Sequence, residues 1–91
     1  MAMETKFKRS GEFFVYILEC NDKTYYTGYT PNIVRRFKLH NDGNGAKYTR
    51  ARRPVRLVYT KKYKYFKPAF LEELRIKRLT RKQKEELIKG V

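Results

Sequence analysis

The run from Phe13 to Cys20 constrains the fold more than any other segment of this chain. It reads Phe-Phe-Val-Tyr-Ile-Leu-Glu-Cys, and its β-branched and aromatic side chains occupy both phases of a two-residue alternation. Successive side chains of a strand point to opposite faces, so the run predicts a strand that is apolar on both faces. In a chain of 91 residues, helices then have to cover both sides of a small sheet.

Two further strands follow along the chain. Asn21–Thr24 has the composition of a turn, so Tyr25 to Tyr29 is predicted to form a hairpin with the first strand. Val55 to Thr60 alternates as a third strand, with a weaker, basic and aromatic continuation through Tyr63 and Tyr65.

The first helix has clear start and stop signals. Thr30 can cap it and Pro31 suits its first position, and we expect it to end near 41–43. Ile33 and Phe37 are four residues apart and should face the core.

Two more helices complete the predicted order β-β-α-β-α-α. Pro68 opens the second, and its predicted inward side chains are Phe70, Leu71, Leu74 and Leu79. Thr80 and Gln83 have the spacing of a capping box for the third, which Gly90 can end. The fold class is therefore α+β, a three-stranded antiparallel sheet flanked by helices. We expect a flexible N-terminal tail over 1–11, one domain over 12–88 and a C-terminal tail over 89–91.

The net charge points to a polyanionic partner. The chain has 23 Lys and Arg against 9 Asp and Glu, a net charge of +14, and such self-repulsion suits a protein that binds nucleic acid. A membrane surface is the second candidate, although no apolar stretch approaches the roughly 20 residues of a membrane span. An apolar signal region is also missing from the N-terminus, so we expect a cytoplasmic protein.

Cysteine and histidine content limits the kinds of site. Cys20 is the only cysteine and His40 the only histidine, so neither an internal disulfide nor a Cys/His zinc site within one chain is possible. Cys20 lies in an apolar run and is predicted to be buried and inert. We expect a monomer, with a protein partner left open.

The segment from Gly43 to Pro54 is predicted to be a long basic loop. Its candidate nucleic-acid contacts are Lys47, Tyr48, Arg50, Arg52 and Arg53. The cations can neutralise phosphates, while the tyrosine can stack on a base or pack on the sheet. An ordinary solvated loop is the alternative, but so long a loop in so small a domain is more often functional or disordered.

Three motifs in this order resemble the GIY-YIG nuclease domain. They are Phe14-Val15-Tyr16, Tyr26-Thr27-Gly28 and the helix segment Asn32-Ile33-Val34-Arg35-Arg36-Phe37. The first departs from the family pattern, because Phe14 replaces its glycine and Val15 its isoleucine. The segments 45–52 and 73–81 are similar to the small stand-alone bacterial members, whose role is largely unassigned. The resemblance covers about residues 12–88.

The resemblance implies an endonuclease that hydrolyses phosphodiesters with activated water and one divalent metal, Mg²⁺ or Mn²⁺. Tyr16 and Tyr26 are then the candidates for the base or for orienting the water, and Gly28 is the motif's structural residue. Arg36 matches the catalytic arginine. His40, one turn later on the same helix face, is a candidate for phosphate binding or proton relay, with a capping or surface histidine as the alternative.

Three cations are candidates to lower the pKa of the tyrosine that acts as base, because a phenol of pKa about 10 is otherwise a poor base. They are Arg35, Arg36 and Lys47. Arg35 lies about 100 degrees around the helix from Arg36, so it is assigned to nucleic-acid binding rather than to the same role.

Glu73 is the predicted metal ligand, with Glu72 as the second acid on the same helix. A single carboxylate with water and substrate phosphate makes a weak site, so Mg²⁺ should bind poorly without substrate. An ion pair between Glu73 and Lys77 is the alternative.

The two tyrosines can share a site only if the hairpin register puts them on one face. Pairing Cys20 with Tyr25 separates them, whereas pairing Cys20 with Tyr26, or a bulge, brings them together; we predict the latter. DNA is the favoured substrate. The alternatives are a non-catalytic nucleic-acid-binding module on this fold and a basic RNA-associated structural protein.

Overall fold

The computed structural model describes residues 10–90 and confirms the predicted fold class. Three antiparallel strands form one sheet in the order β2-β1-β3. In chain order the elements are β1 (Ser10–Glu19), β2 (Tyr25–Thr30), α2 (Ile33–Asp42), α3 (Lys47–Arg50), β3 (Arg56–Tyr65), α4 (Phe66–Lys77) and α5 (Arg81–Lys89). The predicted order lacked only α3, a single turn inside the basic loop.

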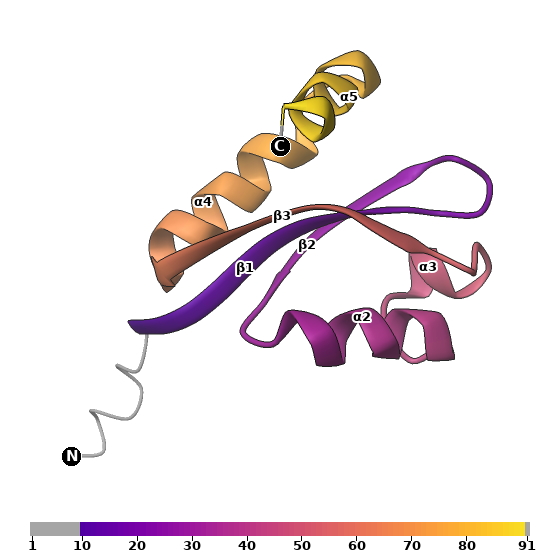
Figure 1. Cartoon of the computed structure of the whole chain (residues 1–91), viewed down its shortest axis with the longest axis horizontal. Helices are drawn as coiled ribbons and strands as arrows, with labels where there is room; N and C mark the ends of the chain where they lie inside the picture. The colour runs from indigo at the N-terminus through magenta and orange to yellow at the C-terminus, as the bar shows by residue number, and fades with distance from the viewer. Residues whose placement is uncertain (1–9, 91) are drawn as a thin grey trace.

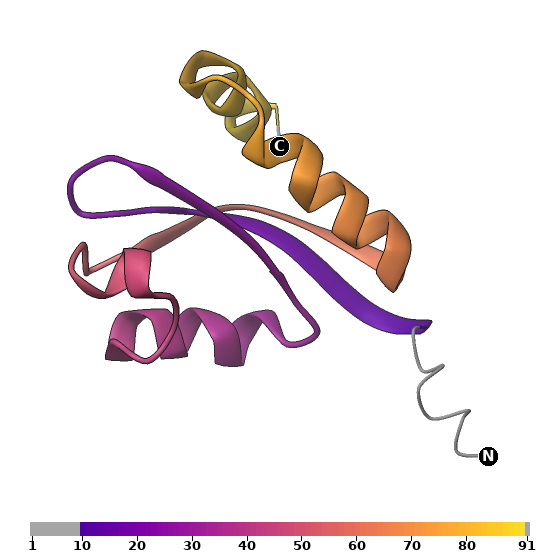
Figure 2. The same ribbon diagram turned by 180° about the vertical axis from the view of Figure 1, so that it is seen from behind.

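The central strand is buried on both faces, as its apolar pattern predicted. Val15 and Ile17 pack with Tyr59 of β3 and the inner face of α4. On the opposite face, Tyr16 and Leu18 belong to a second core cluster, against which side chains of α2 pack. Figures 1 and 2 show the resulting layers, with α2 and α3 on one side of the sheet and α4 and α5 on the other.

The strands extend beyond their predicted ends. β1 begins at Ser10, so two residues of the predicted tail belong to the sheet, while residues 1–9 of that tail lie outside the described residues. β3 runs through Tyr65 as one strand. α5 includes Lys89, the first residue of the predicted C-terminal tail.

The first helix ends as predicted but begins differently. Asn32, not Thr30, is its N-cap, and the Asn32 side chain accepts a hydrogen bond from the Arg35 amide at 3.0 Å. The Thr30 hydroxyl instead accepts a hydrogen bond from the Asn32 amide at 3.2 Å, and the cap lies two residues later than predicted. Gly43 closes the helix with φ of 87°, a left-handed conformation that favours glycine.

The predicted inward face of α4 is wrong for Phe70 and Leu71, whereas Leu79, just beyond the helix, packs against the core as predicted. The helix begins at Phe66, with Pro68 in its first turn, and its buried residues are Ala69, Glu73 and Ile76. Phe70 and Leu71 are exposed instead. Small Ala69 lies in the β1–β3 core cluster, where a larger side chain would hold the helix away from the sheet.

The last helix follows its sequence signals. Thr80 and Gln83 form the reciprocal capping box, and Gly90 is the C-cap. Among the described residues, no helix is long and apolar enough to cross a membrane.

Candidate active site

The hairpin register places Tyr16 and Tyr26 on one face of the sheet. Tyr16 lies opposite Gly28, and Tyr26 is two residues from Gly28 on the same strand. The ring centroids of the two tyrosines are 6.4 Å apart. The shared face is confirmed, but the predicted pairing is wrong by two residues, because the Cys20 amide donates to the Thr24 carbonyl at 2.8 Å.

Gly28 gives the Tyr16 ring the space it occupies. A Cβ at this position would lie 2.7 Å from Tyr16 Oη and 2.9 Å from its Cζ. Any other residue would therefore displace the phenol, so the glycine of the second motif acts through close approach.

A chain of hydrogen bonds anchors the Tyr16 hydroxyl to α3. Tyr16 Oη is 2.9 Å from His40 Nε2, and His40 Nδ1 is 2.8 Å from Thr49 Oγ1. The Thr49 hydroxyl lies 3.0 Å from the Ala46 carbonyl, which can only accept. The Ala46 amide also points at Nδ1, at the longer distance of 3.4 Å. A proton on Nδ1 satisfies the three shorter contacts in sequence, so we assign the tautomer in which Nε2 accepts from Tyr16.

Two residues of this chain of contacts were missed from sequence. Thr49 is fully buried. A Cβ at Gly45 would lie 2.5 Å from His40 Nδ1, so this glycine lets the loop close over the imidazole. Both fall in the segment 45–52 that resembled the small bacterial members, but no chemistry was assigned to them there.

Aromatic side chains extend the site toward the basic loop. The Tyr26 ring is 5.2 Å from the His40 ring and stacks on Tyr48 at 6.1 Å with an interplanar angle of 24°. The Arg52 guanidinium lies 3.9 Å from the centre of the Tyr48 ring. Tyr48 thus packs against a site tyrosine while keeping 37% of its surface exposed.

The cations of the loop divide into two groups. Arg52 bonds to Asp22 at 3.1 Å and to the Tyr48 carbonyl at 2.8 Å, and Arg53 bonds to the Arg50 carbonyl at 2.9 Å. These two arginines hold the loop together. Lys47 and Arg50 are exposed and form no ion pair within the part of the chain that the structure describes, so their charges are available to phosphates.

Arg35 and Arg36 line one small hollow at the start of α2. Its volume is about 160 Å³, and the Asn32 cap and Leu39 also line it. Both arginines therefore border the same space, although they are neighbours about 100 degrees apart around the helix. Planar guanidinium groups suit phosphate oxygens, so this hollow fits a phosphate group.

Burial holds the phenol and the imidazole neutral. It raises the pKa of Tyr16 to about 12, with the Arg36 guanidinium acting the other way and the charges of Tyr26 and Glu73 adding to the rise. Burial, then the positive charge of Arg36, lowers the pKa of His40 to about 4. Of the three cations expected to act on the tyrosine, only Arg36 does so here; Arg35 and Lys47 are not among the groups that shift this pKa. At neutral pH Tyr16 therefore keeps its proton.

Glu73 lies in the opposite layer, on the other side of the sheet from α2. It lies on α4 with its side chain 10% exposed, forms an ion pair with Lys77 at 3.0 Å, and its charge reaches the Tyr16 phenol. Glu72 is held by Arg75 through contacts of 2.6 and 2.8 Å. The ion pair foreseen as the alternative for Glu73 is thus present, and Glu72 is already engaged.

The donor set around Glu73 suits only a weakly held ion. No group of three or more His, Cys, Asp or Glu that could hold a metal occurs among residues 10–90. Mg²⁺ keeps several waters and needs only one or two carboxylates when substrate phosphate completes its shell, so one glutamate is compatible with such an ion.

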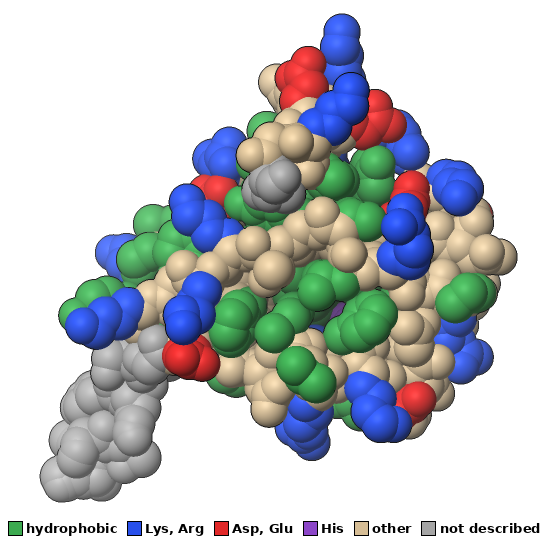
Figure 3. Space-filling model, in the orientation of Figure 1, with side chains coloured by type: hydrophobic (Ala, Val, Ile, Leu, Met, Phe, Trp, Pro, Cys, Tyr) green, Lys and Arg blue, Asp and Glu red, His purple; other side chains and the backbone are tan. Residues whose placement is uncertain are grey.

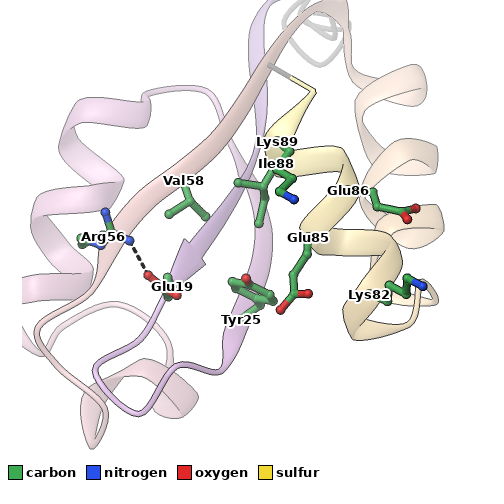
Figure 4. Close-up of a pocket in the computed structure, with 9 residues that line it drawn as sticks. All are labelled: Glu19, Tyr25, Arg56, Val58, Lys82, Glu85, Glu86, Ile88 and Lys89. Atoms are coloured by element: carbon green, nitrogen blue, oxygen red, sulfur yellow. Dashed lines mark hydrogen bonds and ion pairs between the residues drawn. The ribbon is translucent and has the colours of Figure 1, made fainter.

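A separate cavity lies away from these residues. It measures about 430 Å³, and its lining comes from the strand ends near the hairpin turn, represented by Glu19, Tyr25 and Arg56, and from α5. Figure 4 shows acidic, basic and apolar side chains mixed around it. None of the predicted site residues lines it, and the Tyr16 phenol itself is buried.

Comparisons with known proteins identify the family of the chain. Residues 12–86 match the model of the GIY-YIG catalytic domain. A UPF0213 protein of Bacillus velezensis is 51% identical over 75 residues, 82% of this chain and 76% of that protein. One of Halobacterium salinarum is 53% identical over 73 residues, 80% of this chain and 95% of that protein. The solution NMR structure of a UPF0213 protein from Bacillus halodurans shares 47% identity, with a TM-score of 0.58 over 86% of this chain and 83% of that one.

Proposed function

Because the chain belongs to the GIY-YIG catalytic domain family, we propose that it hydrolyses phosphodiester bonds in DNA with a divalent metal ion, Mg²⁺ or Mn²⁺. One observation supports this best. The Tyr16 phenol occupies space that a side chain at Gly28 would fill, and it is hydrogen-bonded to His40. The charges of Arg36 and Glu73 both act on its pKa. A cation, a carboxylate and a proton-accepting pair around one hydroxyl are the groups that phosphodiester hydrolysis needs.

We assign the roles as follows. Arg36, with Arg35 beside it, binds the scissile phosphate in the hollow at the start of α2. Tyr16 takes a proton from the attacking water while its own proton passes to His40 Nε2 along the 2.9 Å hydrogen bond. Tyr26 lies on the same face and orients the water.

This proton route does not require a free phenolate. The low pKa of His40 opposes the transfer in the resting protein, and part of that lowering comes from Arg36. A phosphate anion bound to Arg36 offsets this positive charge, so substrate binding makes His40 a better proton acceptor.

Glu73 would hold the metal ion, together with water and substrate oxygens. The ion supplies charge stabilisation at the phosphate and at the leaving oxygen. Lys77 competes for the same carboxylate at 3.0 Å, which is a further reason to expect weak metal binding without substrate.

The test is a cleavage screen over linear, branched and single-stranded DNA and RNA with Mg²⁺ or Mn²⁺. Glu73→Gln and Glu72→Gln form a matched pair, because both remove one carboxylate from neighbouring positions of α4. We expect metal-dependent products that Glu73→Gln loses and Glu72→Gln retains, while both variants still bind substrate.

A second candidate is a nucleic-acid-binding module without catalysis. The raised pKa of Tyr16 and the lowered pKa of His40 favour it, since neither group is charged at neutral pH. If no substrate in the screen gives a product that Glu73→Gln abolishes, this candidate replaces the nuclease. Tight binding of RNA alone, unaffected by that substitution, would instead indicate the RNA-associated protein.

A further inference from the structure

The corner where β3 runs into α4 is basic and aromatic. Residues 61–67 read Lys-Lys-Tyr-Lys-Tyr-Phe-Lys, and no acidic residue occurs from 61 to 71. β3 is an edge strand of the sheet, so one side of this segment faces away from the other strands. The residues that the argument uses, here called the β3–α4 corner, are Lys61, Lys64, Tyr65, Lys67 and Phe70.

Aromatic surface is exposed at this corner. Tyr65 is 53% exposed and Phe70 38%, and Phe70 stacks on Phe66 with ring centroids 5.6 Å apart. Figure 3 shows hydrophobic and basic side chains side by side where β3 meets α4. Aromatic rings that pack against the protein on one face and are exposed to solvent on the other provide flat surfaces on which a ligand can stack.

The lysines of the corner are free to bind anions. Within residues 10–90, none of Lys61, Lys64 and Lys67 has a carboxylate at ion-pairing distance, whereas Lys62 is paired with Glu12 at 3.2 Å. The Lys64 amine lies 5.8 Å from the centre of the Tyr65 ring. Positive charge and an open ring are thus adjacent.

We propose that the β3–α4 corner binds a single-stranded segment of nucleic acid. Bases stack on exposed aromatic rings while lysines contact the phosphates between them, and a duplex would hide the base faces that Tyr65 and Phe70 can contact. This inference rests on the proposed nucleic-acid partner and narrows it to a substrate with unpaired nucleotides.

The corner lies along the strand that borders the candidate active site. Thr60 of β3 pairs with Tyr16 of β1, and Tyr65 is five residues further on, a distance of about 17 Å along an extended strand. Side chains alternate along β3, so Tyr65 lies on the α4 face with Tyr59, whereas Tyr16 lies on the α2 face. A single strand can therefore join the corner to the Tyr16 site only by crossing the free edge of β3. Favoured substrates carry an unpaired arm next to the bond that is cut.

Fluorescence anisotropy with a labelled single strand tests whether the lysines of the corner contact the phosphates. Measurements are made in EDTA, which prevents cleavage, over a range of salt concentrations. The K61Q/K64Q/K67Q variant is compared with K82Q/K84Q/K89Q, which removes the same charge from α5. The slope of log K against log salt should fall by about 2 for the corner variant, at about 0.7 per lost phosphate contact, and stay near the wild-type slope for the α5 variant.

Tyr65→Ala tests the stacking part. Loss of one base stack should weaken binding of the single strand by about tenfold, with no change for a duplex of the same length. Both outcomes together support the proposal. Thermal unfolding of each variant checks that the exposed substitutions leave the fold intact.

Three results would overturn the inference. The first is an equal salt slope for the corner variant and the α5 variant. The second is that Tyr65→Ala weakens binding of the single strand and of the duplex equally. The third is a dimer, seen by light scattering, that Tyr65→Ala dissociates without affecting nucleic acid binding. In each case wild-type binding still stands, so the proposed function survives. Absence of any wild-type binding to nucleic acid would instead refute both.

Discussion

Acidification should destabilise this protein through His40 before its carboxylates titrate. The native pKa of His40 is about 4 because the ring is buried, whereas an unfolded histidine has a pKa of about 6.5. Between these values the unfolded chain binds a proton that the native protein excludes. The contribution is therefore fully present above pH 6.5 and is lost as the pH falls toward 4, and a difference of about 2.5 units corresponds to about 3 kcal/mol.

The surroundings of the His40 ring explain why a positive charge on the protonated imidazole would not be compensated. His40 is fully buried, Tyr16 and Thr49 bond to its nitrogens, and the Tyr26 ring packs on it. The charged group that acts on it is the Arg36 guanidinium, which opposes protonation.

Urea unfolding followed by circular dichroism at several pH values between 7.5 and 4 measures the effect. His40→Gln is the control, because the acids with lowered pKa, such as Glu19 and Asp22, are unchanged in it. Wild type should lose about 3 kcal/mol more than the variant over this range.

Parallel pH profiles for wild type and His40→Gln would refute the reasoning. An NMR titration of His40 with a midpoint near the unperturbed value of about 6.5 would do the same, because it would show that the native ring takes up a proton freely.

Two substitutions probe the same hydrogen-bonded chain. Gly28→Ala should destabilise the fold by about 1–3 kcal/mol, the usual range for overpacking, because its Cβ would lie 2.7 Å from Tyr16 Oη. Gly90→Ala, whose Cβ would have its nearest contact at 3.5 Å, is the control in urea unfolding. Equal losses of stability in the two variants would argue against the steric cause. Thr49→Val should cost about 1–3 kcal/mol and shift the His40 tautomer signals in long-range ¹⁵N spectra, whereas Thr49→Ser should keep them; unchanged spectra for the valine variant would show that Thr49 does not set the tautomer.

The layer structure was predictable because it depends on local patterns. Apolar side chains in both phases of β1 required cover on two sides, and the capping box of Thr80 and Gln83 marked a helix start whatever the tertiary context. Side-chain alternation alone left two pairings open, and the choice that put Tyr16 and Tyr26 on one face was right although its register was misplaced by two residues. A shift of two leaves every side chain on its face, so the conclusion survived the error.

Features that depend on packing were not predictable. Phe70 and Leu71 are as apolar as Ala69 and Ile76, so the sequence does not show which pair faces the core. Ala69 and Ile76 are buried because α4 approaches the sheet closely there. The burial of His40 depends likewise on the loop that Gly45 allows to close over it. Neither fact is contained in the spacing of residues along one helix.

The site also joins two layers that the sequence keeps far apart. Tyr16 faces α2, whereas Glu73 lies on α4, which covers the other face of the sheet. Its charge adds to the rise in the pKa of the phenol, and α4 packs on β1 and on the edge strand β2 of the three-stranded sheet. A wider sheet would separate the Glu73 carboxylate from the Tyr16 phenol, so the small size of the sheet matters for the site. The position of Glu73 is set by the buried face of α4 and not by a sequence motif.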